Sequence, residues 1–145
     1  MKHKKLSTLR RERAFIGTCL KIILRYERNG QSIPLQRVLA EAVATAPPCY
    51  NISIGRALDV FGRDGARLEE IASSERPGQW RDLARQVLDS MRGPRRMSFG
   101  KALVFNAVYN RPDSYYMSVS HARTLVRPYV TVGRNVVCKP VSINQ

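Results

Sequence analysis

The sequence repeats itself at a constant offset of 65 residues. Residues 42–61 align with residues 107–126, with identical pairs at Ala42/Ala107, Val43/Val108, Pro47/Pro112, Tyr50/Tyr115, Ser53/Ser118 and Ala57/Ala122. In each copy we expect the proline to end one helix, the tyrosine ring to lie beneath the loop, and the serine to cap the next helix. The repeat therefore predicts two helix–loop–helix units, at about 33–61 and 98–126.

A shorter pattern marks the expected helix starts. Residues 52–58 match residues 97–103 in apolar and basic character, and residues 117–122 form a looser third copy. Each segment has an apolar residue, then a serine (Ser53, Ser98 or Ser118), then an alanine one turn later. A serine at this place accepts a hydrogen bond from the free backbone N–H groups of a first turn. The pattern predicts three serine-capped helices.

Apolar periodicity and helix breakers predict the remaining elements. Helices are expected at 8–28, 34–45, 53–61, 66–73, 79–91, 98–109 and 118–126. Ser7 is expected to cap the first helix, and Asn29-Gly30 to end it. The tail 129–145 is rich in β-branched residues, which indicates either a small hairpin or an extended arm that orders on a partner. We expect a mainly α, single domain over 1–145 with one core.

Positive charge is concentrated at the two ends of the chain. The net charge is +14, and 19 of the 25 basic residues are arginine. Residues 1–28, with a basic segment at 1–13, carry nine Lys/Arg and two acids. Residues 29–91 carry seven against eight, and residues 92–145 carry nine against one. Clustered positive charge favours contact with a polyanion, because binding releases counterions.

The first functional hypothesis is therefore a nucleic-acid-binding protein, non-specific or architectural, with no catalytic role. Its units would act as helix–turn–helix-like elements with the hairpin as a wing, although the connection 110–117 is longer than the usual turn. Arg56 and Lys101 would meet phosphates near helix starts. The candidate contacts are Lys2, Lys4, Lys5, Arg10, Arg11, Arg13, Arg56, Arg95, Arg96, Lys101, Arg111, Arg123, Arg127 and Arg134.

The second hypothesis is a structural or assembly protein, such as a virion or mobile-element component. Its basic ends would dock onto an acidic protein surface, and its apolar tail from Tyr129 to Ile143 would suit strand addition to a neighbour. One continuous basic face favours nucleic acid, whereas separate basic tails favour docking into an assembly.

Sequence motifs for catalysis, cofactor binding or metal binding are missing. There is no phosphate-binding loop, dinucleotide fingerprint or nucleophile elbow, and the adjacent Glu69 and Glu70 do not face each other on a helix. Cys19, Cys49 and Cys138 are too widely spaced for a zinc set, and three is an odd number for disulfides. We expect no enzyme activity, no cofactor, no metal and no membrane insertion, and a cytoplasmic protein or one packaged in a virion assembled there.

The residues Ala46, Pro47, Tyr50, Ser53 and Ala57 also carry a resemblance. Their spacing resembles a motif of small basic helical proteins from gut anaerobes and their phages. The resemblance covers about a fifth of the chain and implies no chemistry. It implies a phage or mobile-element origin.

Overall fold

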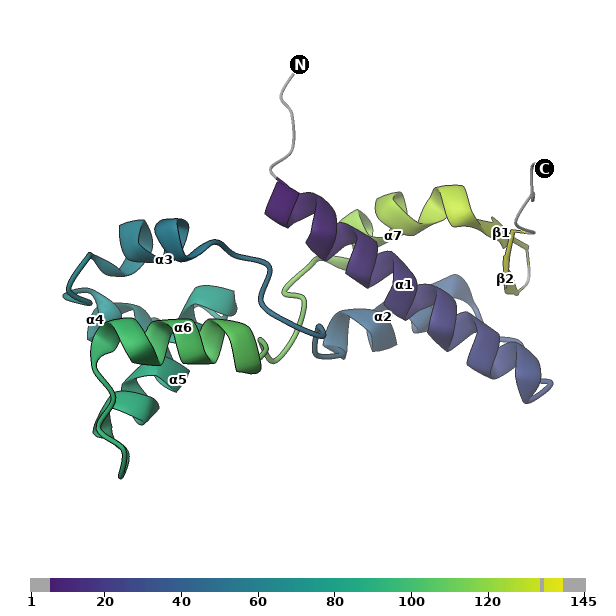
Figure 1. The fold of residues 1–145 in the computed structure, drawn as a ribbon. Helices are drawn as coiled ribbons and strands as arrows, with labels where there is room; N and C mark the ends of the chain where they lie inside the picture. The colour runs from purple at the N-terminus through teal and green to yellow at the C-terminus, as the bar shows by residue number, and fades with distance from the viewer. Residues whose placement is uncertain (1–5, 134, 140–145) are drawn as a thin grey trace, which may run out of the picture.

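The computed structural model describes residues 6–133 and 135–139, which form a mainly helical fold (Figure 1). The α-helices in this part of the chain are α1 (Leu6–Arg28), α2 (Leu35–Ala44), α3 (Ile54–Phe61), α4 (Leu68–Ala72), α5 (Gln79–Arg92), α6 (Phe99–Tyr109) and α7 (Val119–Val126). A 3₁₀ turn (Arg127–Tyr129) leads from α7 into strands β1 (Val130–Val132) and β2 (Val136–Cys138). The predicted fold class is confirmed.

Two of the three predicted serine caps are confirmed, and they belong to the 65-residue repeat. Ser53 Oγ accepts from Arg56 N, and Ser118 Oγ accepts from His121 N, each at 3.1 Å. Ser98 stands at the N-cap position of α6, but its side chain makes no capping hydrogen bond. Ser7 lies inside α1 and is not its cap, because the helix already includes Leu6. The sequence pattern thus locates helix starts without fixing the hydroxyl rotamer.

The tail forms the hairpin that was one of its two predicted forms. β1 and β2 are antiparallel, with Val130 opposite Cys138 and Val132 opposite Val136. The backbone N–H of Val136 also donates to Ile33 O at 3.3 Å, which joins the hairpin to the turn between α1 and α2.

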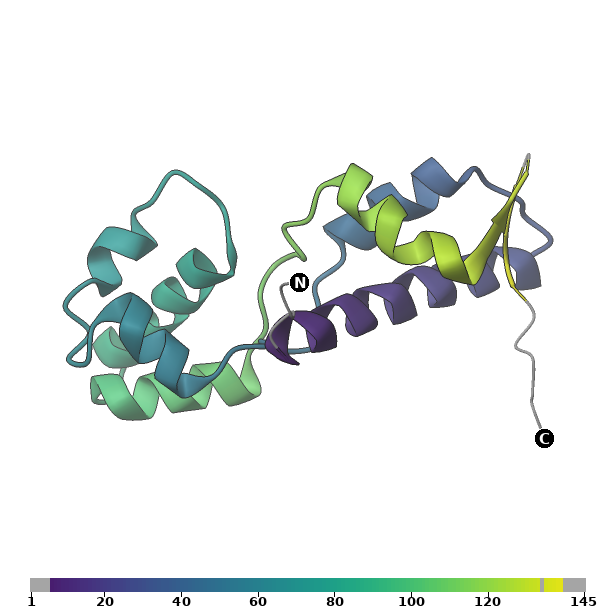
Figure 2. The same cartoon turned by 90° about the horizontal axis from the view of Figure 1, so that it is seen from above.

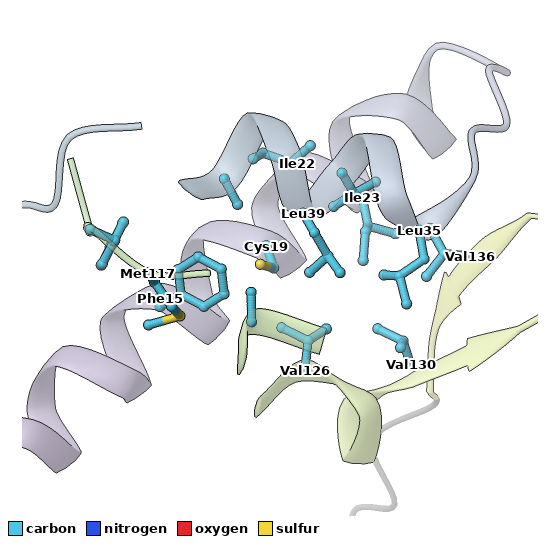
Figure 3. Packing of buried hydrophobic residues seen from close by; sticks show 14 residues of the cluster. Phe15, Cys19, Ile22, Ile23, Leu35, Leu39, Met117, Val126, Val130 and Val136 are labelled. Atoms are coloured by element: carbon cyan, nitrogen blue, oxygen red, sulfur yellow. The ribbon is translucent and has the colours of Figure 1, made fainter. Parts of the chain in front are cut away.

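Buried apolar side chains form two clusters, whereas the chain length predicts one core. The first lobe consists of α1, α2, α7 and the hairpin; the second consists of α3, α4, α5 and α6 (Figures 1 and 2). In the first lobe, the apolar stripe of α1 packs against α2, α7 and the hairpin (Figure 3). In the second, Phe61, Leu83, Val87 and Leu103 are completely or almost completely buried, and Trp80 meets Phe61 edge-on at 5.7 Å. Two cores form because two extended connections separate the helices of the first lobe from those of the second.

The two repeat units cross between the lobes in opposite directions. The connection 45–53 runs from α2 in the first lobe to α3 in the second, and 110–118 runs from α6 in the second lobe to α7 in the first. Equivalent residues have equivalent environments: Pro47 and Pro112 are buried, and Tyr50 and Tyr115 are each buried in the lobe that the chain enters.

The helices of one unit therefore pack in different lobes. α2 packs against α1 and α7, whereas α6 packs against α5 and α3. The prediction of helix–turn–helix-like units with a winged hairpin is wrong, because α6 and α7 contribute to separate clusters. The long connection at 110–117 spans the distance between the lobes and is not a tight turn.

Side chains from α5 clamp both connections. Asp82 Oδ2, in the first turn of α5, accepts from Tyr116 Oη at 2.7 Å and from Asp113 N at 2.9 Å. One turn later, Gln86 accepts from Tyr50 Oη at 2.9 Å and donates to the carbonyl of Arg111 at 3.2 Å. We call Asp82 and Gln86 the α5 clamp. The clamp stabilises the path of both connections between the lobes.

Candidate nucleic-acid interface

The fold brings α1 and the segment 119–139, which lie far apart in the sequence, into the same lobe. The described residues of the first lobe, 6–44 and 119–139 without 134, carry ten Lys/Arg against three acids, Glu12, Glu27 and Glu41. The second lobe, 54–109, carries ten Lys/Arg against seven acids. Charges that lie far apart in the sequence thus add to one field over the first lobe.

The outer face of α1 carries the longest cationic stripe of this lobe. A helix turns about 100° per residue, so Arg10, Arg13, Lys21 and Arg28 lie on the side opposite the buried Phe15. All four are exposed, and they extend over about 27 Å along the helix axis. We call these four residues the α1 basic face.

The α1 basic face has no acidic partner among the described residues. The ion pair that α1 makes with α2 uses Arg25, which contacts Glu41. That contact raises the pKa of Arg25 and lowers the pKa of Glu41. Arg10, Arg13, Lys21 and Arg28 form no such pair within residues 6–133 and 135–139, so their charges remain available to an outside anion.

The start of α1 lies beside the start of α3. An open groove of about 440 Å³ has Arg10 on one wall and the segment Tyr50–Ser53 on the other. Arg56 lies in the first turn of α3 directly after this segment and is exposed. Arg56 thus follows one wall of the groove in the sequence but does not line the groove, and it belongs to the second lobe.

Arg11 has a structural contact and points away from the α1 basic face. Its Nη2 donates to the carbonyl of Tyr115, and burial lowers the pKa of its guanidinium. Tyr115 in turn shares a 3.0 Å hydrogen bond with Thr18 and packs edge-on against Phe15 at 5.1 Å. Arg11 stabilises the second connection on the first lobe.

The other predicted contacts are scattered. Arg95 and Arg96 lie in the turn between α5 and α6, and Lys101 lies on α6, all in the second lobe. Arg111 belongs to the second connection. Arg123 on α7 is 3.4 Å from Gln36 on α2, and Arg127 follows α7. Lys2, Lys4, Lys5 and Arg134 lie outside the described residues.

Lys21 and Arg28 belong to the α1 basic face although they were not among the predicted contacts. Their spacing from Arg10 and Arg13 on a helical projection is the signal that identifies them. The apolar stripe had already fixed the buried side of this helix, so the opposite side followed from the sequence.

The histidine and the cysteines of the described residues lie apart from the α1 basic face. His121 Nε2 lies 3.9 Å from Glu12 Oε1. All three cysteines are free, and burial raises the pKa of the Cys19 thiol to about 12. Across the described part of the chain, no three His, Cys, Asp or Glu side chains are grouped to hold a metal ion. None of the described helices combines the length and the apolarity that crossing a bilayer requires.

Comparison with known proteins gives no relative for this chain: no family model, no curated protein and no solved structure matches it.

Proposed function

We propose that this protein is a non-catalytic nucleic-acid-binding protein that contacts phosphates through the α1 basic face. The observation that carries the proposal is a row of four exposed cations on one side of a 23-residue helix, without acidic partners among the described residues. Three free cysteines are consistent with a cytoplasmic location, which is part of the proposal.

The proposed binding is non-specific. Phosphate contacts position a protein on nucleic acid but carry no sequence information. Arginine and lysine on a straight helix face can follow a phosphate backbone, and Arg56 beside the groove at the start of α1 would extend the contact. The apolar residues of the same face, Leu9 and Leu24, offer no hydrogen bonds to base edges.

The test is a salt titration of binding. The purified chain is mixed with a random DNA duplex and with an RNA of equal length, from about 50 to 200 mM salt, the range over which phosphate contacts weaken strongly. Replacing Arg10, Arg13, Lys21 and Arg28 together by glutamine removes four charges while keeping helix propensity. For duplex DNA we expect this variant to lower the slope of log affinity against log salt by about 3 to 4.

A matched variant controls for net charge. Glutamine at Arg63, Arg76, Arg95 and Arg96 removes four exposed charges from the second lobe. This variant should change the slope by less than half as much, because these residues lie away from the α1 basic face. Equal losses in both variants would show that only net charge matters. No binding of the unaltered chain at about 50 mM salt would contradict the proposal outright.

The second candidate function, a structural or assembly protein that docks onto other proteins, is favoured by a different observation. The outer side of α6 exposes several large apolar side chains in a row. A surface of this kind suits a protein partner better than a phosphate backbone.

A further inference from the structure

Helix α6 is apolar on both its buried and its exposed sides. Ala102 and Leu103 belong to the second cluster, and the polar Asn106 is buried beside them and donates to Ser90 Oγ at 2.9 Å. On the other side Val104 is 48% exposed, Phe105 38%, Val108 61% and Tyr109 75%. Lys101 is the single charged residue of the helix. We call the exposed side with these four apolar residues the α6 outer face. A helix that is apolar on all sides is usually covered on all sides, but no element of the described structure covers this face.

The internal repeat shows what covers the equivalent positions. At the offset of 65, Val104 corresponds to Leu39 and Val108 corresponds to Val43, both on α2. Leu39 is fully buried, and Val43 packs against the first cluster. In that lobe α2 is covered by helices, α1 and α7. The repeat keeps apolar side chains at both positions, but only the first copy has its helical cover.

The charges around the α6 outer face indicate an acidic occupant. Lys101 corresponds to Gln36, whose side chain contacts Arg123 on the covering α7 at 3.4 Å. Lys101 is exposed to water in this structure, so an element that covered it would have to supply an acceptor, and a carboxylate is the strongest one. Arg95 and Phe105 share an open groove of about 520 Å³ with Met97 and Pro94, and Asp89 is its one acid. The groove has room for an apolar anchor side chain beside a cation.

We propose that the α6 outer face binds an amphipathic helix of a protein partner, with an apolar stripe flanked by aspartate or glutamate. Apolar side chains of the partner would cover Val104 and Val108 and enter the groove at Phe105, while its acids would pair with Lys101 and Arg95. A phosphate backbone suits this face poorly, because Lys101 is the one charged side chain of α6 and it shares the exposed side with four large apolar side chains. A second copy would bring the same two cations to the interface, and Asp89 is the one acid that lines its groove.

The test is a selection from a display library of random 16-residue peptides, with the full chain as target. Bound peptides should share apolar residues at helical spacing (i, i+3, i+4, i+7) and an excess of Asp/Glu. Synthetic versions of these peptides should bind the Val108→Ser/Tyr109→Ser variant at least tenfold more weakly, as expected when central apolar contacts are lost. The Lys101→Glu/Arg95→Glu variant should reverse the preference and select basic flanks.

The controls separate this proposal from the others. Val132→Ser/Val137→Ser alters two exposed apolar residues of the hairpin, at the far end of the molecule, and should leave peptide binding unchanged. The α6 variants should also keep the nucleic-acid affinity of the unaltered chain, apart from the effect of net charge. Peptides that bind the Val108→Ser/Tyr109→Ser variant equally well would overturn the proposal. Self-association or nucleic-acid binding that this variant abolishes would do the same.

Discussion

The α5 clamp gives a sharp test of how the lobes are held together. We predict that Asp82→Ala destabilises the protein far more than its small volume change implies. Asp82 is 5% exposed, and its carboxylate accepts from the hydroxyl of Tyr116 and from the backbone N–H of Asp113. Alanine leaves both donors without an acceptor. It also leaves Tyr116 in the left-handed conformation, at φ 49°, without its anchor.

The magnitude follows from these two hydrogen bonds. A hydrogen bond to a charged group contributes about 1.5–3 kcal/mol, and the lower figure applies here because Tyr116 is partly exposed. We therefore expect Asp82→Ala, which removes both bonds, to cost about 3 kcal/mol and Tyr116→Phe, which removes one, about 1.5 kcal/mol. For a chain of this length the first cost corresponds to a fall in Tm of about 6–12 °C.

The assay is urea unfolding followed by two signals. Fluorescence of Trp80, the one tryptophan, reports the second lobe, where the indole packs against Phe61. Far-UV circular dichroism reports the helices of both lobes. A double-mutant cycle compares the unaltered protein with Asp82→Ala, Tyr116→Phe and the double variant. It gives the coupling energy between the two side chains, which we expect to be about 1 kcal/mol.

Two results would refute the argument. Additive effects, with a coupling energy near zero, would mean that the hydroxyl–carboxylate contact stabilises nothing. A cost of Asp82→Ala below about 1 kcal/mol would mean that water satisfies both donors and that the clamp is dispensable.

Three further predictions concern local structure and titration. Ser118→Ala should lower the free energy of unfolding by about 1 kcal/mol, because the hydroxyl of Ser118 caps α7. Ser98→Ala should lower it by almost nothing, because the side chain of Ser98 makes no capping hydrogen bond. Thermal unfolding of the two variants measures both effects. Gly17→Ala should stabilise the protein by up to about 1 kcal/mol, because Gly17 lies in the middle of α1 and an added Cβ would meet open space. Gly65→Ala should destabilise it, because an added Cβ would lie 2.8 Å from a ring carbon of Phe99 and φ is +76°. Burial and the carboxylate of Asp82 raise the pKa of Tyr116 to about 12. The stability that the neutral hydroxyl contributes is therefore fully present below pH 10 and is lost as the pH rises through 12. Absorbance at 295 nm should show a late phenol titration step that Tyr116→Phe removes.

Each of these predictions has a contradicting outcome. Equal costs for the two serine variants would mean that the hydroxyl of Ser98 caps α6 after all. A loss of stability in Gly17→Ala would show that α1 is crowded at this point. A titration curve that keeps its late step in Tyr116→Phe would assign that step to Tyr50 or Tyr115, whose pKa values burial also raises.

The duplication has a consequence for how the lobes are connected. Because each unit starts in one lobe and ends in the other, two chain crossings and the α5 clamp join the lobes. A change in either connection therefore acts on both lobes. This arrangement distinguishes the fold from two independent helical domains on a flexible linker.

The sequence by itself determined the helices, most of their ends and the apolar side of α1, and it limited the tail to a hairpin or an extended arm, between which the fold decided. These features depend on local physics: helical periodicity, the breaking effect of proline and glycine, and serine caps such as Ser53. The outer face of α1 followed from the same periodicity. The repeat also predicted that the rings of Tyr50 and Tyr115 would lie beneath the loops, and both residues are buried.

Only the tertiary structure decided which helices meet. Sequence proximity suggested that the helices of one repeat unit pack together, but α2 pairs with α7 and α6 pairs with α5. Which helices pack together depends on which apolar faces fit in space. Periodicity and capping residues describe a single helix and do not specify the distant helix that it packs against. The same reason explains why the division into two cores, the buried Asp82 at the clamp and the uncovered face of α6 came only from the fold.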